Sequence, residues 1–118
     1  MNALFLCHPK CTTCKKAMAW MDAQGVGYTF RDIRLDNPSA GELRAWIPKS
    51  GLDVKRFFNT SGMLYRSMAL ADRLKSMSAD EMVALLATDG MLVKRPLLVT
   101  EDKVLVGFRE AEWAQALL

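Results

Sequence analysis

Residues 4–14 read LFLCHPKCTTC. The first four residues are apolar and predict a short buried strand, and residues 8–10 predict the turn that ends it. From Cys14 onward, apolar residues recur at the spacing of an amphipathic helix. This strand-to-helix junction places Cys11 at a helix N-terminus, with Cys14 three residues later on the same face.

The setting of Cys11 is typical of a reactive thiol. Unpaired backbone N–H groups and the helix dipole favour a thiolate over a neutral thiol at a helix N-terminus. Cys14 lies about one helical turn away, which is within reach of a disulfide. We therefore predict that Cys11 is a nucleophile, that Cys14 resolves its intermediates, and that oxidation joins these two while Cys7 stays reduced in the core.

Length and composition restrict the function classes. The chain has 118 residues, which suits one domain, and its net charge of +3 comes without a lysine or arginine block. Direct nucleic-acid binding is therefore not expected. No signal-peptide pattern or membrane-length apolar run is present in the sequence. We expect a cytoplasmic monomer without a membrane partner, and in a reducing cytosol CxxC is catalytic or metal-binding.

The remaining chain divides into a strand–helix–strand unit, a helical block and a hairpin. Residues 26–33 alternate apolar and polar side chains and predict a strand after the first helix, which should end near Gly25. Capping boxes begin helices at Ser39 and Ser78 in the block 36–92, and Gly90 is expected to stop the second of these. Residues 97–106 predict an antiparallel hairpin, followed by a C-terminal helix.

Motifs along nearly the whole chain resemble those of the arsenate reductase/Spx family of thioredoxin-fold proteins. The similarity is greatest to the branch that carries CxxC and an Asn-Thr-Ser-Gly turn. The resemblance implies one α/β domain over residues 1–118, with a thioredoxin-like mixed four-stranded sheet (residues 1–35 and 93–118) interrupted by a helical insert (residues 36–92). The matching motifs are CTTCKKA at 11–17, DI at 32–33, FNTSG at 58–62, YR at 65–66, DGML at 89–92, KRPLL at 94–98 and VGF at 106–108.

The family resemblance also implies roles for individual residues. Cys11 matches the nucleophile, Arg95 an arginine that binds the anionic substrate, and Pro96 a cis-proline that faces the active cysteine. Asn59 stands where arsenate reductases carry a second oxyanion-binding arginine, and Arg109 is the candidate for a third. Because one guanidinium is missing, we expect arsenate reductase activity to be weak or absent.

The leading hypothesis is therefore an enzyme: a thiol–disulfide oxidoreductase or a glutathione-linked reductase. Its substrate would be a small thiol or disulfide, or a protein disulfide, and it would hold no bound cofactor. Glutathione or another external thiol would be the reductant. Besides Asn59, its substrate-binding groups would be Arg95, Pro96, the backbone N–H groups of Thr12 and Thr13, and Arg109. The alternative is an Spx-like redox-sensing regulator with the RNA polymerase α subunit as its partner.

Two other interpretations of the cysteine cluster are a packing role and a metal site. Cys14 could serve packing alone, because a free cysteine behaves as a small hydrophobic side chain. Cys7, His8, Cys11 and Cys14 could hold zinc, but structural zinc sites join two separated ligand pairs and no second pair follows in the sequence. We therefore predict no metal. His8 is interpreted as a solvated loop residue.

Overall fold

A four-stranded mixed sheet forms the centre of the protein in the computed structural model, which describes residues 2–118. The strand order is β2-β1-β3-β4. β1 pairs with β2 in parallel and with β3 antiparallel, and β3 pairs with β4 antiparallel. This is the expected α/β fold with a mixed sheet. The strands are β1 (Asn2–Cys7), β2 (Gly27–Asp32), β3 (Leu97–Val99) and β4 (Val104–Val106).

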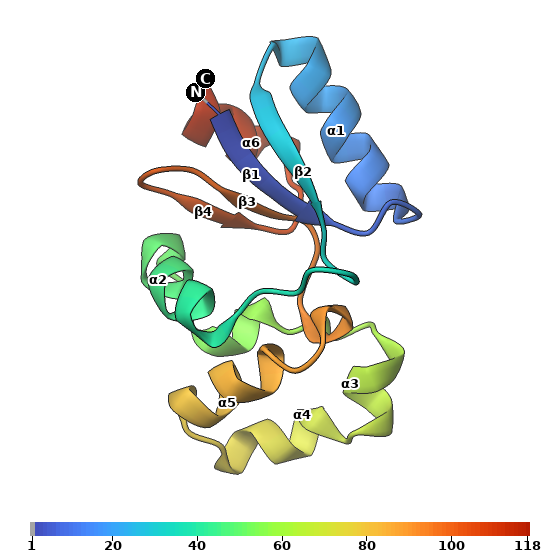
Figure 1. Ribbon diagram of the computed structural model, residues 1–118, viewed down its shortest axis with the longest axis vertical. Coiled ribbons are helices and arrows are strands. Elements are labelled where there is room, and N and C mark those ends of the chain that lie inside the picture. Colours follow the sequence, from blue (N-terminus) through green and yellow to red (C-terminus); the bar gives the residue numbers. More distant parts are fainter. Residues whose placement is uncertain (1) are drawn as a thin grey trace.

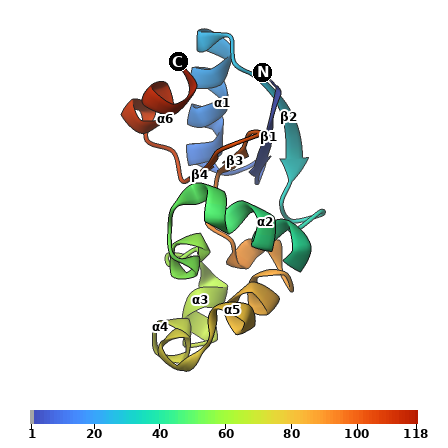
Figure 2. The ribbon, with the colours of Figure 1, turned by 90° about the vertical axis from the view of Figure 1, so that its left-hand side faces the viewer.

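Helices cover both faces of the sheet and extend beyond one end of it (Figure 1). α1 (Thr12–Gln24) and α6 (Glu110–Leu117) pack on one face, and α2 (Ala40–Ser50) packs on the other (Figure 2). The rest of the segment between β2 and β3 lies at the end away from the termini. It contains η1 (Val54–Phe57), α3 (Met63–Ser67), α4 (Leu70–Arg73), η2 (Leu74–Ser76), α5 (Ala79–Leu86) and η3 (Gly90–Leu92).

Strand alternation divides the core into two layers. Along β1, Phe5 and Cys7 face the layer with α1 and α6, whereas Leu6 faces the layer with α2. In the same way, Leu98 and Leu97 of β3 belong to opposite layers. Cys7 therefore packs beneath α1 because of its strand position.

Local capping explains where the predicted helices begin and end. Ser39 and Ser78 both form complete capping boxes, in which their hydroxyls accept hydrogen bonds of 3.1 Å from the backbone N–H of Glu42 and Glu81. Gly25 ends α1 in the left-handed conformation, with φ of 72°. Within residues 2–118, none of the helices combines the length and apolar character that a membrane span needs.

Gly90 has a different role from the one that its sequence context indicates. α5 already ends at Leu86, and Gly90 begins η3 instead of stopping α5. Its buried backbone presses against the end of β2, so that a Cβ at this position would lie only 1.8 Å from the carbonyl oxygen of Ile33. The requirement for glycine therefore comes from close contact between insert and sheet.

An ion pair joins the sheet to the start of the insert. Arg31 of β2 donates two hydrogen bonds to the carboxylate of Glu42, at 2.7 and 2.9 Å. The same carboxylate accepts a hydrogen bond of 3.0 Å from the backbone N–H of Ser39. These donors, the Arg31 guanidinium first, lower the pKa of Glu42 from 4.5 to about 2.

The Arg31–Glu42 pair predicts a pH-dependent loss of stability in Glu42→Gln. The native carboxylate stabilises the fold fully above pH 4.5, and this contribution disappears as the pH falls towards 2. Because Glu42 is partly exposed, we expect a loss of about 1–2 kcal/mol at pH 7, decreasing below pH 4.5. Urea unfolding at several pH values measures it.

Glu81→Gln is the matched control, because Glu81 closes the second capping box without an arginine partner. It should lose less stability than Glu42→Gln at pH 7. Equal losses in the two variants would assign the effect to the capping boxes and contradict a contribution from Arg31.

Candidate active site

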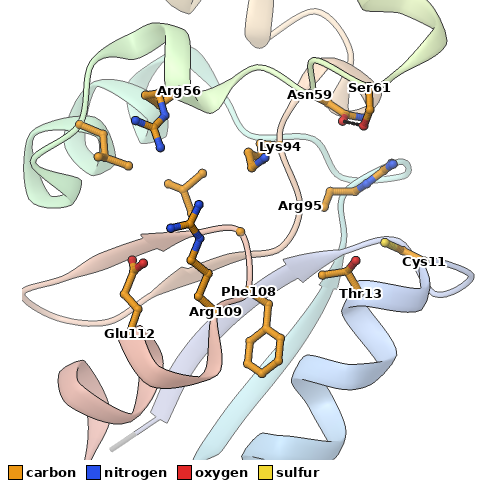
Figure 3. Close-up of a pocket in the computed structure, with 13 residues that line it drawn as sticks. Cys11, Thr13, Arg56, Asn59, Ser61, Lys94, Arg95, Phe108, Arg109 and Glu112 are labelled. Atoms are coloured by element: carbon orange, nitrogen blue, oxygen red, sulfur yellow. Dashed lines mark hydrogen bonds between the residues drawn. The ribbon is translucent and has the colours of Figure 1, made fainter.

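A cleft of about 380 Å³ opens between the sheet and the insert, and Cys11 lies on its wall (Figure 3). Its walls come from the start of α1, the loop into β3, the loop after β4 and the beginning of the insert. The cleft therefore joins segments that are far apart in the sequence. The lining residues are Cys11, Thr13, Leu52, Arg56, Asn59, Ser61, Lys94, Arg95, Val106, Gly107, Phe108, Arg109 and Glu112.

Cys11 is the N-cap residue of α1, as the sequence predicts. Its backbone is extended, and its carbonyl accepts the first helical hydrogen bond, 3.1 Å from the N–H of Lys15. Its side chain makes no capping hydrogen bond, so the partly exposed thiol is available to the cleft. Thr13 also lines the cleft, whereas the side chain of Thr12 is exposed outside its lining.

Arg95 and Pro96 enter the site from the loop before β3. The peptide bond between them is cis, in agreement with the family resemblance. Pro96 is buried behind the lining, where its carbonyl accepts a hydrogen bond of 2.8 Å from the N–H of Gly107. The guanidinium of Arg95 lies on the Cys11 side of the cleft (Figure 3), and its Nη1 lies 3.2 Å from the sulfur of Met91.

Asn59 lies in the cleft wall contributed by the Asn-Thr-Ser-Gly turn. Gly62 closes this turn with a hydrogen bond of 3.1 Å from its N–H to the carbonyl of Asn59. The hydroxyl of Ser61 donates to Oδ1 of Asn59 at 3.2 Å. The position expected for a second arginine therefore faces the site, but it presents a neutral amide.

Further positive charge comes from Arg56 of η1 and Lys94, two lining residues that sequence reasoning left out. Arg109, the candidate third arginine, also lines the cleft, from the N-cap of α6. In Figure 3, Arg56 and Arg109 approach each other from opposite walls, at the end away from Cys11. With Arg95 they make the cleft cationic, and Glu112 adds a carboxylate. The residues around an exposed arginine or lysine do not indicate that its side chain will line a cleft together with charges from distant segments.

The three cysteine sulfurs form one cluster, with all Sγ atoms within 4.8 Å of one another. The disulfide in the structure joins Cys7 to Cys14 and leaves Cys11 free. The predicted Cys11–Cys14 pair with reduced Cys7 is therefore wrong for this state. The cause is the strand alternation described above, which directs Cys7 towards the buried face of α1 where Cys14 lies.

The Cys7–Cys14 disulfide also removes two of the candidate metal ligands in this cluster. A cysteine in a disulfide is not a thiolate ligand, so in this state Cys11 alone keeps a free thiol. His8, the fourth ligand considered from the sequence, accepts a hydrogen bond at Nδ1 from the backbone N–H of Lys10, at 3.0 Å. Burial, together with the charges of Arg34 and Arg95, lowers the pKa of His8 from its ordinary value.

With this geometry established, comparison with known proteins identifies the family. The ArsC family model matches residues 6–116. The chain belongs to the ArsC family. It is 48% identical to the protein YusI of Bacillus subtilis, over 98% of each chain. It is also similar to the crystal structure of an ArsC family related protein from Bacteroides fragilis, with 54% identity, a TM-score of 0.94 and 98% of each chain covered.

Regulators form a second group of ArsC-family relatives. The global transcriptional regulator Spx of Staphylococcus haemolyticus is 24% identical, over 88% of this chain and 78% of the regulator. The proteins similar to this chain therefore include one named as a regulator and one named as a possible arsenate reductase. Because similar proteins are named both as regulators and as reductases, the function of this chain is argued from the chemistry of its cleft.

The site geometry predicts that Cys11 is alkylated first. In the native protein iodoacetamide should label Cys11, because Cys7 and Cys14 are both fully buried. The same order should persist after reduction, since burial still shields these two. Peptide mapping by mass spectrometry measures the order, with the reduced and denatured protein as the control in which all three cysteines are labelled. Earlier labelling of Cys14 would contradict the assignment.

Proposed function

We propose that this protein is a thiol–disulfide oxidoreductase or glutathione-linked reductase that uses Cys11 as nucleophile and Cys14 as resolving thiol. One observation carries the proposal: a free thiol at the N-terminus of α1 lines a cationic cleft, with the sulfur of Cys14 within 4.8 Å. A reducing cytosol would be its compartment, and an external thiol its reductant.

The reaction follows ordinary thiol–disulfide exchange. In the reduced protein, the Cys11 thiolate attacks one sulfur of a substrate disulfide, forms a mixed disulfide and releases the other sulfur as a thiolate. The Cys14 thiolate then attacks Sγ of Cys11, and the second half of the substrate leaves as a thiolate. The backbone N–H groups at the start of α1 stabilise the Cys11 thiolate that attacks in the first step.

The charge of the cleft favours an anionic substrate. Arg95 lies near the reacting sulfur, whereas Arg56 and Arg109 lie at the other end of the cleft. Guanidinium groups bind carboxylates through paired hydrogen bonds, and a peptide thiol such as glutathione carries carboxylates at both ends. A glutathione mixed disulfide therefore suits the charge of this cleft.

Cysteine variants test this function directly. The reduced wild-type protein should reduce a glutathione mixed disulfide, whereas Cys11→Ser should fall to the background rate because it lacks the attacking sulfur. Cys14→Ser should accumulate the mixed disulfide on Cys11, which intact-mass spectrometry detects as added glutathione. Unchanged reduction by Cys11→Ser, with normal folding, would overturn the proposal.

The neutral amide of Asn59 predicts poor activity on arsenate. Each charge-assisted hydrogen bond lost costs about 1.5–3 kcal/mol, which is roughly a ten- to hundredfold change in rate. We expect Asn59→Arg to raise arsenate reduction by about that factor and to leave disulfide reduction much less affected. Asn59→Gln is the matched control, because it lengthens the side chain without adding charge. If wild-type protein already reduces arsenate as fast as Asn59→Arg, the role of this position is wrong.

A regulatory function is the alternative, because the similarity to Spx covers most of the chain. In that case the cysteine cluster would switch binding to the RNA polymerase α subunit. A pull-down with the C-terminal domain of this subunit, using oxidised and reduced protein in parallel, distinguishes the functions. Redox-dependent capture without disulfide reductase activity would favour the regulator.

A further inference from the structure

Cys7 is the cysteine that the proposed function does not use, yet it forms the disulfide in the structure. We propose that Cys7 is a third redox-active thiol, which takes over the disulfide from Cys11 and returns Cys11 to the free state. This inference rests on the proposed function for the two steps that precede it. It is supported by the pairing of the sulfurs, by their burial and by the position of the cleft.

The cluster connects an accessible sulfur with two inaccessible ones. Cys11 is partly exposed and lines the cleft, whereas Cys7 and Cys14 are 0% exposed. The Cα atoms of Cys7 and Cys14 lie 6.1 Å apart, a separation suited to a disulfide. Because all three sulfurs lie within 4.8 Å, Cys14 can exchange one partner for the other with little displacement of the backbone.

The transfer is a third exchange step that requires no further reagent. After the two steps above, Cys11 and Cys14 share a disulfide and the substrate has left as two thiolates. The thiolate of Cys7 then attacks Sγ of Cys14. A bond between Cys7 and Cys14 forms, the bond between Cys11 and Cys14 breaks, and Cys11 leaves as a thiolate. The number of disulfides and electrons in the protein is unchanged by this step.

Electrostatics and access favour this direction. The departing Cys11 thiolate returns to the N-terminus of α1, where backbone N–H groups stabilise it. The new disulfide lies in the apolar layer with Trp20, Leu98 and Trp113, where external thiols cannot reach it. Reduction of the protein reverses this step: the Cys11 thiolate attacks Sγ of Cys14, the Cys7–Cys14 bond breaks and Cys7 leaves as a thiolate. An external dithiol then reduces the Cys11–Cys14 bond at the cleft and becomes a disulfide itself.

Packing alone is the competing explanation for Cys7. The residue does occupy the core, as expected from its place in an apolar strand. A packing role, however, predicts a buried thiol that stays reduced when the protein is oxidised. The proposed transfer predicts instead that Cys7 ends in the disulfide and that Cys11 becomes available again. The two explanations therefore differ in which cysteine remains free.

The number of thiolates released from a disulfide reagent distinguishes the packing role of Cys7 from the disulfide transfer. Fully reduced protein, freed of reductant under anaerobic conditions, is mixed with excess dithiobis(nitrobenzoate), a symmetrical disulfide whose thiolate product is coloured. With the transfer, wild-type protein should release about three thiolates, because regenerated Cys11 attacks a second molecule. Its final state should be a Cys7–Cys14 disulfide with the reagent attached to Cys11, as peptide mapping will show.

Two variants provide the comparison. Cys7→Ser and Cys7→Ala should each release about two thiolates and end with a Cys11–Cys14 disulfide. Agreement between a polar and an apolar replacement excludes an effect of core polarity. Mapping of the wild-type protein tests the proposal even if neither variant folds.

The outcomes also separate this inference from the proposed function. If the wild-type protein releases about two thiolates and keeps a Cys11–Cys14 disulfide with Cys7 reduced, the transfer is wrong and the proposed function stands. If Cys11→Ser releases about two thiolates as fast as the wild-type protein releases its first two, the proposed function fails together with the transfer.

Discussion

Backbone hydrogen bonding along both edges of β1 is the interaction on which the rest of the structure depends. Parallel pairing with β2 requires the crossover that α1 supplies, and this sets the N-terminus of α1 beside the end of β1. Antiparallel pairing with β3 aligns Leu6 with Leu97. Arg95 and Pro96, which directly precede Leu97, therefore arrive beside the loop that carries Cys11.

The site combines two contributions with different physical origins. The sheet and α1 supply the sulfur cluster, which depends on burial and on alternation along β1. The insert and the loops around β3 and β4 supply the charged walls of the cleft. The sulfur cluster and the charged walls therefore lie on different segments, so that either can change in sequence without the other.

Features governed by short-range interactions were predictable from the sequence. Capping boxes at Ser39 and Ser78, the left-handed Gly25 and the position of Cys11 at a helix start all depend on residues a few places apart. The mixed sheet with its helical insert followed from strand and helix periodicity combined with the family resemblance. The cis bond before Pro96 followed from the resemblance alone.

Features that depend on distant segments were not predictable in the same way. The pairing of Cys7 with Cys14 depends on how closely α1 packs against β1, and spacing within the motif favoured the shorter Cys11–Cys14 span. Arg56 and Lys94 are exposed charges whose convergence on the cleft appears only in three dimensions. Gly90 follows a helix and resembles an ordinary stop signal, although its contact is with Ile33 of a remote segment.

The contact between Gly90 and Ile33 restricts which residue position 90 can hold. No space exists there for even one methyl group, and the insert that carries Arg56 and Asn59 rests on the same junction. A side chain at this position would clash with Ile33 and Asn37 and so disturb the support of one cleft wall without touching any reacting group. Position 90 therefore constrains the cleft through the space that a side chain would need, whereas position 59 sets its charge by presenting a neutral amide.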